Sequence, residues 1–264
     1  TMAIKKAWGG RFKKKTASSV ESFTESISFD QRLYKYDIEG SIAHTTMLAK
    51  CKLITNREKD KIIKGLKGIL KDFETGKLKF KTEHEDIHMN IESALVKRIG
   101  NVAKKLHTAR SRNDQIALDL RLWARDQIQE ITKIILNLQR EIIKKAKPVW
   151  QGVLPGFTHL QHAQPILVGH YFLAYVEMLE RDRTRLGDCL KRLNKSPLGA
   201  CALGGTTLNT KPEITGKLLG FDSVFDNSLD AVSDRDFSLE YAAALSIISM
   251  HLSRFSEEWI IWSS

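Results

Sequence analysis

The sequence predicts an all-α protein with an N-terminal helical domain and a bundle of long helices. Alternating, strand-like patterns are sparse, whereas apolar residues recur at steps of three and four over the second half of the chain. One such stretch, from about Ser111 to Lys147, continues unbroken until Pro148. At 1.5 Å per residue it would form roughly 55 Å of helix. A helix of this length needs long neighbours to cover its apolar face, so we expect a bundle.

The elements follow from these patterns in chain order. Residues 1–107 are interrupted by Gly and Asn and are expected to form a separate, mainly helical N-terminal domain. Residues 108–264 are expected to form the central bundle domain, incomplete at its C-terminal end. The apolar stripe of its first long helix consists of Ile116, Leu120, Trp123, Ile131, Ile135, Leu138 and Ile142.

Two further long helices are expected in the bundle domain. One runs from Pro165 to about Leu193, because proline is well tolerated in a first helical turn. The other runs from about Ala231 to the end of the sequence and has no Gly or Pro stop signal. Since its last turn carries two Trp and two Ile residues, we expect the natural chain to continue. Residues 196–227, rich in Gly, Thr and Pro, indicate loops and short elements.

The composition is that of an ordinary soluble protein, with 42% hydrophobic and 28% charged residues. No apolar stretch approaches the ~20 residues of a membrane helix, and the N-terminus lacks the apolar segment of a secretory signal. The three cysteines are far apart without a CxxC pair, which favours a reduced, cytoplasmic setting. The net charge of +11 comes largely from lysines interspersed with acids, so no nucleic-acid partner is expected.

The segment Thr108–Gln115 stands at the start of the first long helix. Ser111 and Asp114 fit a capping box, with Asp in place of the usual Glu. Two arginines, the Asn113 amide and the free N–H groups of a helix start are also suited to binding a carboxylate. The residue chemistry alone leaves open whether this is an anion site or only a capped helix start with exposed arginines.

The segment Pro155–Pro165 is expected to be a turn that leads into a helix. It offers a hydroxyl, two imidazoles and two amides, on Thr158, His159, Gln161, His162 and Gln164. A histidine in such a turn can act as a general acid or base near neutral pH. The alternative is a polar loop that caps the next helix.

Three other motifs have simpler alternatives. Leu203–Thr207 can hold an anion or form a tight turn. Ser233 and Asp236 fit a capping box at the start of the last helix, and Arg235 is a candidate second anion contact. The segment His84–His88 matches H-E-x-x-H, which on a helix can bind zinc. That pattern has only three fixed positions and no convincing third ligand, so no metal is expected.

Taken together, these motifs resemble the fumarase/aspartase superfamily, and specifically its argininosuccinate lyase and delta-crystallin family. The resemblance implies a homotetramer with a central helical bundle, active sites built from three subunits, and no cofactor. It also implies reversible β-elimination of argininosuccinate to L-arginine and fumarate, a step of arginine biosynthesis. The matching pieces occur in family order and are Trp8–Phe12, Ser26–Asp30, Glu85–Glu92, Thr108–Gln115, Pro155–Pro165 and Ser233–Phe237.

The resemblance also implies roles for individual residues. His159 matches the catalytic histidine, which serves as the acid for the departing nitrogen or as part of a proton relay. The segment around Asp86 and His88 is recast as part of a substrate site without metal. The expected substrate-binding residues are Ser26, Asp30, Asp86, His88, Ser111, Arg112, Asn113, Thr158, Gln161 and Arg235.

One conserved region of the family has no counterpart in these 264 residues. It is a flexible loop with the signature G-S-S-x-M-P-x-K-x-N, and it carries the serine usually assigned as the catalytic base. We therefore expect this chain to be inactive alone. The alternatives that the residues leave open are a non-enzymatic, crystallin-like helical oligomer, a lyase acting on another succinyl substrate, a zinc peptidase and, more distantly, a nucleic-acid-binding module.

Overall fold

The computed structural model describes residues 17–264, so the predicted Trp8–Phe12 motif lies outside the described residues. The chain forms two compact units, one of Thr1–Trp123 with Lys195–Ser233 and one of Ala124–Asn194 with Asp234–Ser264. The units divide the chain at places other than the domain boundary expected after residue 107. The reason is that the start of the long helix α6 (Arg112–Ala146) packs into the core of the N-terminal helices.

Side-chain hydrogen bonds cap two helices of the first unit, α4 (Asn56–Glu74) and α5 (Ile87–Ile99). Thr55 and Glu58 form a complete capping box at the start of α4. Asp86 caps α5, because its Oδ1 accepts a hydrogen bond from the Met89 N–H at 2.7 Å. The elements are α1 (Ser18–Thr24), α2 (Ile27–Asp30), η2 (Gln31–Leu33), α3 (Tyr34–Lys50), α4 (Asn56–Glu74), η3 (Thr82–His84), α5 (Ile87–Ile99) and η4 (Gly100–His107).

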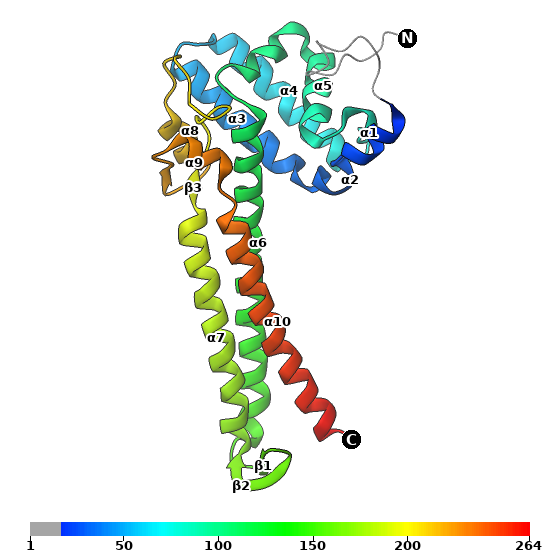
Figure 1. Ribbon diagram of the computed structural model, residues 1–264, viewed down its shortest axis with the longest axis vertical. Helices are drawn as coiled ribbons and strands as arrows, with labels where there is room; N and C mark the ends of the chain where they lie inside the picture. Colours follow the sequence, from blue (N-terminus) through cyan, green and yellow to red (C-terminus); the bar gives the residue numbers. More distant parts are fainter. Residues whose placement is uncertain (1–16) are drawn as a thin grey trace. The chain divides into compact units, whose positions relative to one another are not determined.

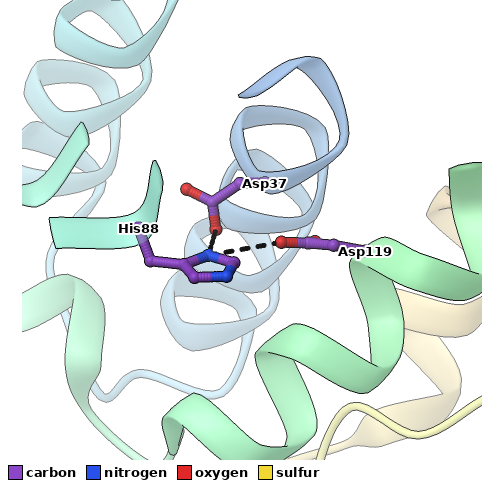
Figure 2. A group of neighbouring side chains, drawn as sticks. All are labelled: Asp37, His88 and Asp119. Carbon is purple, nitrogen blue, oxygen red and sulfur yellow. Dashed lines mark hydrogen bonds and ion pairs between the residues drawn. The ribbon is translucent and has the colours of Figure 1, made fainter. Parts of the chain in front are cut away.

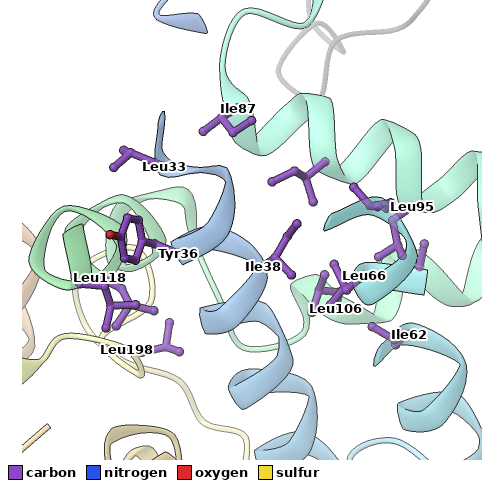
Figure 3. Packing of buried hydrophobic residues seen from close by; sticks show 14 of the residues in the cluster. Leu33, Tyr36, Ile38, Ile62, Leu66, Ile87, Leu95, Leu106, Leu118 and Leu198 are labelled. Carbon is purple, nitrogen blue, oxygen red and sulfur yellow. The ribbon is translucent and has the colours of Figure 1, made fainter. Parts of the chain in front are cut away.

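The core of the first unit lies where α3, α4, α5 and the start of α6 meet (Figure 3). Ile38 of α3, Leu66 of α4, Leu95 of α5 and Leu118 of α6 are all fully buried. A Cβ on Gly40 would lie 2.6 Å from Leu118 Cδ2, so a larger residue at this position would force Leu118 to shift. The packing of α3, α5 and α6 brings polar residues of these three helices together beside the core.

The first unit is completed by short elements from the second half of the chain. They are β3 (Lys195–Ser196), α8 (Pro212–Leu218), β4 (Ser223–Val224) and α9 (Ser228–Ser233). Strands β3 and β4 are parallel, and α8 packs against α3. The loops and short elements predicted for residues 196–227 are therefore confirmed.

The second unit is built from the remainder of α6 together with α7 (Val168–Leu193) and α10 (Asp236–Trp262), which run side by side (Figure 1). Gln139 Nε2 of α6 donates to Val176 O of α7 at 3.1 Å. His251 Nδ1 of α10 lies 2.7 Å from Asp182 Oδ2 of α7. Between α6 and α7 lie η5 (Lys147–Val149), β1 (Val153–Thr158) and β2 (Gln161–Leu167). Among the described residues, no helix is both long and apolar enough to cross a membrane.

The long helix predicted from Ser111 to Lys147 is confirmed within one residue at each end. Its apolar stripe is correct in the second half, where Ile135 and Ile142 are buried. In the first half, Leu118 and Leu122 are fully buried, while the predicted Ile116, Leu120 and Trp123 are half-buried. The start of α6 is enclosed on more than one side by the first unit, so a single stripe does not describe its burial.

Two predicted helix starts were wrong. Pro165 belongs to β2, where it pairs with Pro155 of β1, and α7 begins only at Val168. Prolines are tolerated there because each strand of a two-stranded hairpin has a free edge.

The last helix starts at Asp236 rather than near Ala231. Ser233 ends α9 and donates its hydroxyl to Leu229 O at 2.8 Å, so the predicted capping box with Asp236 does not form. Asp234 Oδ1 accepts the Asp236 N–H instead.

Candidate functional site

Five of the predicted site residues gather in the first unit, and we call them the N-terminal cluster: Ser26, Asp30, Asp86, His88 and Arg112. They come from the start and end of α2, the start of α5 and the start of α6. Ser26 Oγ donates to Asp30 Oδ2 at 2.6 Å, and the Ile87 N–H donates to Asp30 Oδ1 at 3.2 Å. These bonds tie α2 to the start of α5.

Asp30 is the most enclosed carboxyl on the α2 side of the cluster. Burial raises its pKa above the ordinary value, although the hydrogen bonds from Ser26 and Ile87 oppose that effect.

The turn before α5 separates the two histidines of the H-E-x-x-H pattern. His84 ends η3, Glu85 adopts a left-handed φ of 63°, and His88 lies in α5. Glu85 O accepts hydrogen bonds from the Ser26 and Ile27 N–H groups at 2.9 and 3.0 Å, which holds the turn against α2. Because the two histidines do not share a helix, the zinc-binding face required by this pattern is not formed.

Asp86 and Arg112 bring opposite charges together at the surface of the cluster. Asp86 Oδ2 lies 3.5 Å from Arg112 Nε, while Asp86 Oδ1 caps α5. Arg112 also donates through Nη1 to Gln115 Oε1 at 3.3 Å. Arg112 is the first residue of α6, where the backbone N–H groups of the first turn have no partner within the helix. Such a place binds a carboxylate well.

The cap of α6 differs in detail from the predicted capping box. Asp114 Oδ1 accepts the Ser111 N–H at 2.9 Å, as predicted. Ser111 Oγ accepts from the Asn113 N–H, at 3.3 Å, in place of the Asp114 N–H. The Ser111 hydroxyl and the Asn113 N–H are therefore bonded to each other at the start of α6.

Asp114 also fixes the loop that precedes the Leu203–Thr207 motif. Its Oδ2 accepts the Gly199 and Cys201 N–H groups at 3.2 and 2.9 Å. Asn113 Nδ2 donates to Ala202 O at 2.7 Å, so the predicted substrate amide is engaged with this loop. Burial raises the Asp114 pKa, and the three backbone hydrogen bonds oppose that change. The loop is thereby held against the start of α6.

The sequence analysis missed two buried acids that contact His88, namely Asp37 of α3 and Asp119 of α6 (Figure 2). His88 Nδ1 lies 3.2 Å from Asp37 Oδ1 and 3.4 Å from Asp119 Oδ2. Asp37 also accepts from Gln115 Nε2. In the sequence, Asp119 is visible only as an acid between Leu118 and Leu120 of a predicted helix. No sequence pattern links it to His88.

The two acids differ in their ionisation. Burial raises the pKa of Asp37, but the hydrogen bond from His88, the positive charge of Arg110 and the hydrogen bond from Gln115 outweigh it, so the Asp37 pKa is lowered. Burial and the neighbouring Asp37 raise the Asp119 pKa well above its ordinary value.

Asp37, His88 and Asp119 are also the group whose donor atoms lie close enough, within 4.8 Å of one another, to be metal ligands. Arg110 is half-buried, and its charge interacts favourably with both carboxyls. A fixed cation therefore already balances negative charge at this place, which fits a hydrogen-bonded ion cluster better than a divalent metal site.

Thr158, His159 and Gln161 lie in the β1–β2 hairpin of the second unit. Thr158 pairs with Gln161, and the two-residue turn between them is His159-Leu160 with φ values of 52° and 58°. Two successive left-handed residues are typical of a type I′ turn, where Asn-Gly is usual. His159 is exposed at the tip of the hairpin in an uncommon backbone conformation, as residues at functional sites often are.

Arg235 also belongs to the second unit. It is exposed, stands immediately before α10 and donates through Nη1 to Asp234 O at 2.6 Å. The predicted residues thus divide between the two units. The first holds the N-terminal cluster with Ser111 and Asn113, and the second holds Thr158, His159, Gln161 and Arg235.

Comparisons with known proteins identify the family of this chain. Residues 10–264 match the profile of a family described as Lyase. The argininosuccinate lyase of Acetivibrio thermocellus is 56% identical over 259 residues, which cover 98% of this chain and 57% of that protein. The argininosuccinate lyase of Acinetobacter baylyi is 54% identical over 257 residues, covering 97% of this chain and 54% of that protein. The chain therefore spans little more than half the length of these relatives.

Solved structures show the same fold. EDDS lyase in complex with formate superposes with a TM-score of 0.82 at 31% identity, over 89% of this chain and 46% of that one. A fumarate lyase:delta crystallin from Brucella melitensis, bound to cobalt, gives a TM-score of 0.77 at 17% identity, over 93% and 59% of the two chains, and so shares the fold alone. The all-α fold class predicted from the sequence is confirmed.

Proposed function

Because the chain belongs to the lyase family that its residues 10–264 match, we propose that it is part of an enzyme with argininosuccinate lyase activity. The reaction is the reversible elimination of argininosuccinate to L-arginine and fumarate, in arginine biosynthesis. The observation that carries this proposal is the high identity to argininosuccinate lyases over nearly the whole chain. The aligned residues include the motifs that carry the resemblance to the family.

The elimination needs a base, a set of donors and an acid. A base removes a proton from the carbon beside a carboxylate, and the C–N bond to the arginine portion then breaks as the double bond of fumarate forms. Negative charge grows on the carboxylate and is stabilised by fixed donors. Arg112, Asn113, Thr158 and the first N–H groups of α6 are suited to this role. His159 protonates the departing nitrogen, directly or through a relay.

The N-terminal cluster suits a substrate with charges of both signs. Asp86 and Arg112 stand 3.5 Å apart, so a carboxylate and a guanidinium of one ligand find complementary partners there. Asp30 belongs to the same cluster and accepts hydrogen bonds from Ser26 Oγ and the Ile87 N–H. We place the arginine portion of the substrate toward Asp30 and Asp86 and its carboxylates toward Arg112.

We also propose that the working enzyme is a cytoplasmic homotetramer with sites shared between subunits. The predicted site residues belong to two different compact units, which is consistent with motifs that meet across subunits. Helix α10 also leaves large apolar side chains exposed, as an uncovered bundle face does: Leu239, Met250, Leu252, Ile260 and Ile261. The base in this scheme is the serine of the family's third conserved region, which this sequence does not contain.

A second candidate function is a lyase acting on a different N-substituted succinyl compound. The likeness to EDDS lyase favours this alternative, because it exceeds a likeness of fold, and a variant of that enzyme has been solved with bound fumarate. Both candidates release fumarate, and they differ in the amine that leaves.

The test measures fumarate release by ultraviolet absorbance, with argininosuccinate and EDDS as separate substrates. The full-length gene product and residues 1–264 alone are compared side by side. We expect the full-length protein to cleave argininosuccinate and residues 1–264 to be inactive. Cleavage of EDDS alone would support the second candidate. A folded full-length protein that cleaves neither compound would leave the crystallin-like, non-enzymatic alternative.

A further inference from the structure

His88 is held by its Nδ1 alone. The imidazole stands at the start of α5 and points toward α3 and α6 of the same unit, where Asp37 and Asp119 meet it (Figure 2). The three side chains are almost completely buried. Both carboxyl contacts, at 3.2 and 3.4 Å, are to Nδ1. Among the hydrogen bonds of the described residues, none uses Nε2 of this ring, so Nε2 is left for another partner.

The surroundings of Asp37 favour its carboxylate form. Asp37 receives hydrogen bonds from His88 and Gln115, and the Arg110 guanidinium adds a positive charge. The neighbouring Asp119 has a raised pKa, because two adjacent buried carboxyls do not both ionise easily. Asp37 therefore presents an acceptor to Nδ1, and an acceptor at that position requires Nδ1 to carry the proton.

We propose that Asp37 is a positioning residue, which keeps the proton of His88 on Nδ1 and so leaves the Nε2 lone pair to accept an N–H group of the substrate. In a neutral histidine, the hydrogen bond made by one ring nitrogen decides which nitrogen carries the proton. An Nε2 acceptor suits the nitrogen-rich, cationic portion of the substrate. The identity of the ligand that contacts Nε2 rests on the proposed function, whereas the tautomer of His88 does not.

The alternative for the same three side chains is a divalent cation bound by Asp37, His88 and Asp119. A metal on Nδ1 requires that nitrogen to be deprotonated. The position of the proton on His88 therefore separates the two interpretations.

The experiment is NMR of this chain labelled with ¹⁵N-histidine, in which ¹⁵N shifts distinguish the two neutral tautomers. The His88 signals are assigned by their loss in His88→Gln. We expect Nδ1 to be protonated and Nε2 unprotonated in the neutral ring. An Nε2–H tautomer in the unmodified chain overturns the proposal, as does a stoichiometric shift of the His88 signals when Zn²⁺ is added to chelator-treated protein.

Two variants of similar volume separate the carboxyls. His88 Nδ1 and Gln115 Nε2 both contact Oδ1 of Asp37, so an Asn could still accept from both, whereas Asp37→Leu removes the acceptor. We expect the preference for Nδ1–H to be lost and the Nε2–H tautomer to gain population in Asp37→Leu. Asp119→Asn replaces the acid with the raised pKa by a neutral group and keeps the Nδ1–H tautomer. His251, which contacts Asp182 in the second unit, serves as an internal control whose signals stay unchanged in both variants. An unchanged Nδ1–H population in folded Asp37→Leu overturns the proposal; if that variant does not fold, the unmodified chain decides.

Kinetics of the full-length gene product test the substrate contact. We expect Asp37→Leu to raise KM at least about 10-fold, in line with other supporting partners of histidine, with a smaller effect on kcat. Asp119→Asn should change KM far less, because it leaves the acceptor of Nδ1 in place. An unchanged KM in Asp37→Leu would overturn the assignment of Nε2 to the substrate. Failure of the unmodified protein to cleave argininosuccinate would refute the proposed function, while the tautomer result would stand independently.

Discussion

His44 of α3 shows how a single buried side chain links folding to pH. Its ring is fully buried, and Nε2 donates to Thr108 O at 2.8 Å. Burial lowers the pKa of His44 to about 3, and the nearby charge of Arg110 acts in the same direction. The ring is therefore neutral in the folded protein at pH values where an unfolded chain would protonate it.

The first prediction follows from the direction of this shift. A histidine with a lowered folded pKa contributes stability that is complete above its unfolded value and is lost as pH falls toward about 3. Between pH 7 and pH 4.5 the loss from His44 is about 2–3 kcal/mol. His44→Gln keeps a donor for Thr108 but cannot titrate, so its unfolding free energy should depend less on pH. Urea denaturation of both chains at both pH values measures this, and equal acid losses would contradict it.

The second prediction concerns Asp114, whose carboxyl oxygens accept three backbone N–H groups. Asp114→Asn turns an NH₂ group toward donors and leaves at least one of them unpaired. We expect the free energy of unfolding to fall by about 1–3 kcal/mol, the usual cost of an unsatisfied buried group. Glu130→Gln on the exposed face of the same helix is the control, with an expected change within ~0.5 kcal/mol. Equal stabilities of the two variants would disprove the role of Asp114.

The third prediction separates His159 from its neighbour His162, since both are exposed in the same hairpin. In the full-length gene product, His159→Asn should lower kcat by about 10²-fold or more, the range of a lost general acid. His162→Asn should change kcat far less, because only His159 matches the family's catalytic position. The rate of fumarate release measures both. Similar rates for the two variants would remove His159 from the proposed mechanism.

At the scale of elements, periodic patterns predicted the helices well and the hairpin poorly. The limits of α6 follow from Pro148 and an unbroken apolar period. The β1–β2 hairpin was taken for a turn and a helix start, because Pro165 has a favoured place in both structures. Its turn, His159-Leu160, lacks the Asn-Gly signal that usually marks such hairpins.

The fourth prediction tests the strain in that turn. Leu160 has a φ of 58° and is 81% exposed, so its side chain contributes little packing. Leu160→Gly should stabilise the hairpin by about 1 kcal/mol, because glycine adopts this conformation without the usual penalty. Leu167→Gly, at an extended position of β2, should weaken it. Hydrogen exchange of the β1 amides measures both changes, and slower exchange in Leu167→Gly than in Leu160→Gly would contradict the argument.

At the scale of the whole molecule, helix α10 leaves large apolar side chains exposed. The fifth prediction is that the full-length gene product sediments as a tetramer. Leu239 is 71% exposed, and Leu239→Glu should shift the protein toward smaller species because it places a charge in an apolar contact. Lys133→Gln, at an exposed polar position of α6, should not. A tetramer unaffected by Leu239→Glu would exclude this part of α10 from the interface.

The helical fold class, the extent of α6 and the family could be read from the sequence alone, because each depends on residues close together in the chain or on contiguous motifs. The cluster around His88 could not. Asp37 and His88 are 51 positions apart, and they meet Asp119 only when α3, α5 and α6 pack around the same core. The hairpin at His159 likewise depends on the pairing of Pro155 with Pro165. Local patterns determine which segments are helices, whereas the burial and ionisation of a side chain depend on partners that only the packed chain brings to it.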